Sequence, residues 1–155
     1  MCLIDERLLH LSPTEEVTGF QVMVSVDEEV FESRYARLKS KDWKSEFRKN
    51  AETLYSLHNW YDAEYHAASR AEYLTLIEGE VMVRDSNDKI VMTPPGFHAY
   101  KYLITAMDAC PPKGDQRWCV VRVTLKEVVA EGMAWHGACW RGKKRRIDKI
   151  ERRAY

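Results

Sequence analysis

The sequence contains no long apolar run, and we do not expect its first residues to be a leader peptide. No stretch approaches the roughly 18–20 consecutive apolar residues that span a bilayer. The N-terminus, MCLIDERLLHL, carries acidic groups early and has neither a basic segment nor a continuous apolar segment, so it does not resemble a signal peptide. We therefore expect a cytoplasmic protein without membrane association.

The common nucleotide-binding and serine-hydrolase motifs are absent as well. The chain contains no P-loop, no G-x-G-x-x-G and no G-x-S-x-G, which excludes the best-known signatures of nucleotide binding and of serine hydrolases. Without a secretion signal, reduced thiols are the default for the four cysteines, which show no dense disulfide spacing: Cys2, Cys110, Cys119 and Cys139. We expect no cofactor.

What is present is the composition of one ordinary globular domain over residues 1–155. The chain is 45% hydrophobic and 31% charged, with no net charge, and a chain of this length builds a core without disulfides or metals. The five Trp and eight Tyr are many for this size. Both residue types fill cores first, and both also anchor binding surfaces.

The hydrophobic periodicity predicts an α+β fold. Residues 28–66 are predicted to be mainly helical, in two amphipathic pieces, because Asp27 offers an N-cap and apolar residues then recur at intervals of three and four. Residues 72–150 are predicted to be mainly strand, with a hairpin, a short helix after Tyr102, a strongly alternating strand from Arg117 and a final edge strand. With a strand over 18–26, this predicts a mixed, mainly antiparallel sheet with one or two amphipathic helices packed on it.

Two metal sites are conceivable from the spacing of possible ligands. A cupin-like site would use His98 after the Pro-Pro-Gly turn, with Glu72 and Gly79 at E-x6-G spacing, although Glu64-Tyr65-His66 departs from the H-x-H of that family. A zinc site would use thiolates and an imidazole but lacks a C-x2-C knuckle; its ligands would be Cys110, Cys119, His136 and Cys139.

A small enzyme is the second hypothesis for the chain. His98 is the candidate general base, and His136 and Glu131 are the residues that would converge on it. Cysteine–histidine catalysis would also need a thiol next to an imidazole in space, which a sequence does not show.

Charge is unevenly distributed, with acidic groups in residues 1–32 and basic groups at the C-terminal end. A basic stretch with nearby aromatics suits a binding surface, for a protein or, through phosphates and stacked bases, for nucleic acid. Zero net charge is atypical of a dedicated nucleic-acid domain. The residues predicted to contact a partner are Trp135, Trp140, Arg141, Lys143, Lys144, Arg145 and Arg146.

The segment PPGFHAYK, the later CVVRVTLKEVVAEG and the closing RID together resemble a group of small uncharacterised phage and bacterial proteins. The resemblance covers only residues 96–155, and Lys126-Glu127 stands where that group has a glycine. It rests on Gly96, Phe97, His98, Ala99, Ala106, Val121, Val123, Leu125, Val128, Gly132 and Ile147.

The resemblance implies a protein from a mobile element, and it implies no chemistry. Our first functional expectation is therefore a phage-type accessory protein in the cytoplasm of a host cell. It would bind a host protein or a protein–nucleic-acid machine, as an inhibitor of a defence system would. The alternatives are the small enzyme around His98 and direct nucleic-acid binding through the basic end.

Overall fold

The computed structural model describes residues 4–33, 54–63, 81–93 and 96–155. These residues form ten strands and one helix, α3 (Leu103–Ala109). The strands are β1 (Ile4–Leu8), β2 (Val17–Ser25), β3 (Val30–Ser33), β4 (Leu54–Ser56), β5 (Trp60–Asp62), β6 (Val81–Arg84), β7 (Ile90–Thr93), β8 (Phe97–Tyr100), β9 (Trp118–Ala134) and β10 (Gly137–Arg153).

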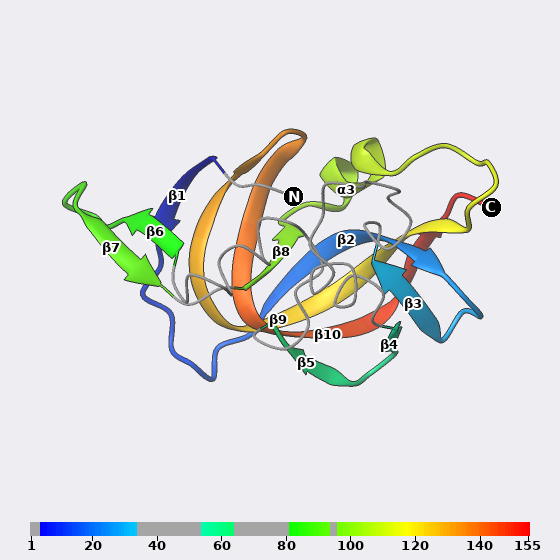
Figure 1. Ribbon diagram of the computed structural model, residues 1–155, viewed down its shortest axis with the longest axis horizontal. Coiled ribbons are helices and arrows are strands. Elements are labelled where there is room, and N and C mark those ends of the chain that lie inside the picture. Colours follow the sequence, from blue (N-terminus) through cyan, green and yellow to red (C-terminus); the bar gives the residue numbers. More distant parts are fainter. Residues whose placement is uncertain (1–3, 34–53, 64–80, 94–95) are drawn as a thin grey trace, which may run out of the picture.

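A long, bent hairpin of β9 and β10 is the centre of the sheet (Figure 1). Each strand has 17 residues, and Glu127 has a positive φ of 51° close to the register shift between Arg141 and Gly142. Such irregularities bend a strand and increase its twist. β9 consequently pairs with β1 near its C-terminal end and with β2 along its N-terminal half.

β2 crosses this hairpin and closes a ring of four strands. It pairs with β9 from Val17 to Val24 and meets β8 where Phe20 lies opposite Tyr100, while β8 in turn pairs with β10. The crossing is tight, because a Cβ on Gly19 would lie only 2.7 Å from the Cβ of Ala99. The rest of the sheet extends from this ring in the order β4-β3-β2-β8-β10-β9-β1-β6-β7, with β5 on β10.

The two faces of β9 support two separate cores, as its alternation predicts. Val121 and Leu125 pack with Phe31, Tyr55 and Phe97 in one cluster. Val120, which points to the other face of β9, packs in a second cluster with β2, β8 and α3. The predicted alternating strand is therefore confirmed, as are the strand at 18–26, the hairpin of β6 and β7, the strand β8 and the short helix after Tyr102.

The α+β prediction is wrong: the described chain is a large mixed sheet with one short helix. Within the predicted helical region 28–66, the described residues form β3, β4 and β5, and residues 34–53 and 64–66 lie outside the described ranges. The carboxylate of Asp27 does accept two backbone N–H groups, from Glu29 at 3.0 Å and Val30 at 2.8 Å. This capping chemistry holds the β2–β3 turn instead of a helix, because Asp side chains bond local backbone in both settings.

The predicted edge strand at the C-terminal end is the last part of β10. β9 pairs with β10 from Gly137 to Arg153, whereas on the other side β8 pairs only with residues 139–142 and β5 only with residues 144–146. The first half of β10 therefore lies inside the sheet, which was not predicted, and among the described strands Ile147–Arg153 has a neighbour on one side only. Helix α3, the one helix of the described residues, falls short of what crossing a membrane requires in length and apolar character.

Candidate functional site

The three candidate catalytic residues do not converge. His98 is buried on β8 opposite Arg141, whereas Glu131 lies opposite Trp140, and adjacent positions on a strand point to opposite faces. Glu131 forms an ion pair with Lys101. His136 lies in the β9–β10 turn with its ring edge-on to Tyr100, 6.4 Å between centroids. The structure thus assembles no acid–base pair from these residues.

The candidate zinc ligands are not brought together either. Among the described residues, no group of three or more His, Cys, Asp and Glu side chains is arranged to hold a metal ion. Cys119 and Cys139 belong to the two different cores, and burial raises the pKa of each thiol to about 12. Of the cupin-like pattern, Glu64, His66, Glu72 and Gly79 lie outside the described residues.

The basic C-terminal end is a central strand, and two of its arginines are buried. Arg141 is 1% exposed; its Nε donates to Glu6 Oε1 at 2.8 Å and its Nη2 to Thr93 Oγ1. Arg145, also 1% exposed, lies between the rings of Tyr55 and Phe97, 4.3 and 4.1 Å from their centroids. Neither guanidinium is presented to a partner in this conformation.

The other predicted contact residues of β10 are at least partly accessible. Lys144 is exposed and pairs loosely with Glu127 at 3.6 Å, while Arg146 pairs with its neighbour Asp148 at 2.7 Å. Lys143 is half-buried. Trp140 packs against the first core beneath the ammonium of Lys101, 4.0 Å from the ring centroid. A role for these residues in partner binding stays a prediction.

Trp135 is the most exposed large hydrophobic residue of the described chain, at 92%. Three more exposed apolar side chains come from the segments that meet at this turn: two lie at the start of α3, whose Thr105 approaches Gly137, and one lies on β9 opposite Ala138. They are Tyr102 at 61%, Ile104 at 68% and Met133 at 50% exposed. We call these four residues the hairpin tip.

Tertiary contacts fix the hairpin tip in place. Lys101 N donates to Ala138 O at 2.9 Å, which joins the start of α3 to β10. A Cβ on Gly137 would lie 2.7 Å from Thr105 Cγ2, so only glycine lets the turn approach the helix this closely.

Of the four tip residues, sequence analysis predicted only Trp135 as a contact residue. The other three come from segments about 30 residues apart, Tyr102–Ile104 and Met133, and no local pattern joins them.

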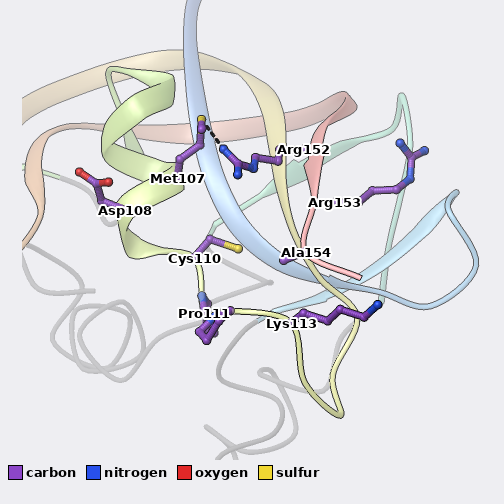
Figure 2. A pocket seen from close by; sticks show the side chains of 9 residues that line it. Met107, Asp108, Cys110, Pro111, Lys113, Arg152, Arg153 and Ala154 are labelled. Carbon is purple, nitrogen blue, oxygen red and sulfur yellow. Dashed lines mark hydrogen bonds between the residues drawn. The ribbon is translucent and has the colours of Figure 1, made fainter.

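A pocket of about 390 Å³ lies at the opposite end of α3 (Figure 2). We call it the C-terminal pocket. Its walls come from the last turn of α3, the proline-rich loop that follows and the end of β10. The lining residues are Met107, Asp108, Cys110, Pro111, Pro112, Lys113, Arg152, Arg153 and Ala154.

Glu28 ties the end of β10 to the β2–β3 turn beside this pocket. Its carboxylate accepts from Arg153 at 2.9 Å, from Arg117 at 3.1 Å and from the Tyr155 hydroxyl at 2.7 Å. The hydrogen bonds from Arg153 and Tyr155 lower the pKa of Glu28 below its ordinary value. The charge of Arg153 is thus already matched by a carboxylate.

Comparisons of the chain with protein-family models, with curated proteins and with solved structures give no match.

Proposed function

We propose that this protein acts by binding another protein through the hairpin tip. The observation that carries the proposal is that Tyr102, Ile104, Met133 and Trp135, each at least half exposed, belong to the two segments that meet where Thr105 approaches Gly137. Scattered exposed apolar residues are normal on a protein surface, but a contiguous group is typical of an interaction site. Tyr, Trp and Met are also the residue types enriched in protein interfaces.

Trp135 is the expected anchor of this interface. A Trp side chain buries about 150–250 Å², which at roughly 25 cal/mol per Å² corresponds to about 4–6 kcal/mol of transfer free energy before the costs of association. The tip is already ordered by its contacts with α3, so little further ordering is required on binding. Both features are those of a binding hot spot.

The resemblance of residues 96–155 to small phage and bacterial proteins supports a mobile-element origin and a host protein, alone or in a nucleoprotein complex, as the partner. Binding at the tip would act by occlusion: it covers a surface that the partner needs for its own contacts. Lys144, exposed on the middle of β10, lies away from the tip and would reinforce such a contact only with an acidic region of a large partner.

A pull-down from host lysate with the wild-type chain and the Trp135→Ala variant tests the proposal, with and without nuclease. We expect the wild-type chain to retain one protein in stoichiometric amount, with or without nuclease. The Trp135→Ala variant should bind that protein with an affinity lower by roughly 30-fold or more, as for a hot-spot residue, and should therefore retain much less of it. Because Trp135 is exposed, its loss should leave stability within about 0.5 kcal/mol. A partner lost with nuclease would favour nucleic-acid binding instead. No retention, or equal retention by both chains, would refute the tip as the binding site.

A further inference from the structure

Met133 brings a thioether to the surface of the hairpin tip. Its side chain is 50% exposed, and it lies near the C-terminal end of β9, two residues before Trp135. Peroxides oxidise a methionine thioether to a sulfoxide, which converts a flexible apolar side chain into a polar one and disrupts interfaces that contain it. Oxidation of Met133 would therefore change the apolar surface of the tip itself.

The structure describes the side chains of two other methionines, and both are better protected from oxidation. Met23 is 2% exposed and belongs to the first core cluster. Met107 is half-buried, and its Sδ accepts a hydrogen bond from Arg152 Nη1 at 3.7 Å (Figure 2). A cationic donor on the sulfur lone pair makes that sulfur a poorer nucleophile. Of these three methionines, Met133 is therefore the one that peroxide should oxidise first.

We propose that Met133 is a site of reversible oxidation by peroxide that weakens partner binding through the hairpin tip, an inference that rests on the proposed function. The sulfur lone pair attacks one oxygen of hydrogen peroxide, the O–O bond breaks, and the other oxygen leaves as water. The sulfur loses two electrons and the peroxide gains them. A methionine sulfoxide reductase reverses the step, with two thiols as the reductant and a disulfide and water as the products.

The position of Met133 makes oxidation affect binding more than folding. In the free protein the half-exposed side chain leaves the sulfoxide oxygen in contact with water, so the fold should persist. At an interface, the same oxygen loses its water and meets a partner surface that fits an apolar side chain. A polar group buried without a hydrogen-bond donor is unfavourable, so we expect binding to weaken about tenfold or more.

The experiment treats the full chain with hydrogen peroxide and then with dithiothreitol, which returns oxidised cysteines to thiols and leaves methionine sulfoxide in place. Peptide mass spectrometry should find Met133 oxidised before Met23 and Met107. In the pull-down from nuclease-treated host lysate, the oxidised chain should retain less of the protein than the untreated chain, and methionine sulfoxide reductase should restore retention. Met133→Leu should bind equally before and after peroxide, whatever its own affinity, whereas Met107→Leu should remain as sensitive to peroxide as the wild type.

Oxidation of Met23 or Met107 before Met133 would overturn the proposal, and so would sensitivity to peroxide that persists in Met133→Leu. The Trp135→Ala variant separates these outcomes from a failure of the hairpin tip. If Trp135→Ala lowers retention and oxidation of Met133 does not, binding through the tip stands and the oxidation site is refuted. If neither change lowers retention, the tip is not the binding site and both proposals fail.

Discussion

Replacement of Arg141 by methionine should destabilise the protein by about 3–5 kcal/mol, as measured when one partner of a buried ion pair is removed. Arg141 is 1% exposed, and its carboxylate partner Glu6 has a side chain only 9% exposed. The variant leaves the carboxyl group of Glu6 buried and without this guanidinium. For a chain of this length, where 1 kcal/mol corresponds to about 2–4 °C, the loss corresponds to a fall in Tm of about 6–20 °C.

Urea unfolding followed by circular dichroism measures this loss directly, and two further variants show that the buried pair causes it. Lys144→Met removes a partner of Glu127 in a pair whose side chains are 46% and 34% exposed, so it should cost about 0–1 kcal/mol. The double variant Arg141→Met with Glu6→Leu removes both buried charges and should be more stable than Arg141→Met alone. A loss below about 1 kcal/mol in Arg141→Met, or no recovery in the double variant, would refute the structural role of the pair.

Three further predictions concern other parts of the fold. Arg153 and Tyr155 lower the pKa of Glu28, so the contribution of Glu28 to stability is present above its ordinary pKa of 4.5 and is lost as the pH falls through the lowered value. The difference in Tm between the wild type and Glu28→Gln should therefore shrink on acidification from pH 7. A difference in Tm that stays constant would contradict this role of Glu28. Cys119 and Cys139, with pKa values raised to about 12, should be alkylated far more slowly at pH 8 than Cys110 in the folded chain and at similar rates in urea. Gly19→Ala should cost about 1–3 kcal/mol in urea unfolding, since its new methyl would meet β8 at 2.7 Å, and a neutral effect would argue against the crossing of β2 over β8.

Local sequence patterns predicted those strands whose hydrophobic alternation or flanking turn residues are visible in the sequence itself. The alternation through Val120 and Val121 shows a strand buried on both sides, and the polar turn between β6 and β7 marks a hairpin. The run Val30-Phe31-Glu32 is short enough to fit helix or strand. Its state is decided by the pairing of Phe31 with Tyr55, 24 residues away in the chain, which no local pattern records.

The position of β10 could not be predicted because its buried charges are compensated from distant segments. A run such as RGKKRRIDKIERR is typical of a solvated end, since arginine is rarely buried without a partner. Glu6, which pairs with Arg141, lies 135 residues earlier, and the rings around Arg145 come from β4 and β8. The other three residues of the hairpin tip, Tyr102, Ile104 and Met133, were not predicted for the same reason, because the approach of α3 to Gly137 is a tertiary contact.

The most direct test of the hairpin tip compares two substitutions that differ only in place. Ile104, in the tip, is 68% exposed, and Ile90, on the edge strand β7, is 60% exposed. Ile104→Ala and Ile90→Ala remove the same atoms from similarly exposed positions, so a general loss of apolar surface would affect both alike. In a pull-down from nuclease-treated host lysate, we predict that Ile104→Ala retains clearly less of the partner than Ile90→Ala, which should match the wild type. Equal retention by the two variants would contradict binding through the hairpin tip.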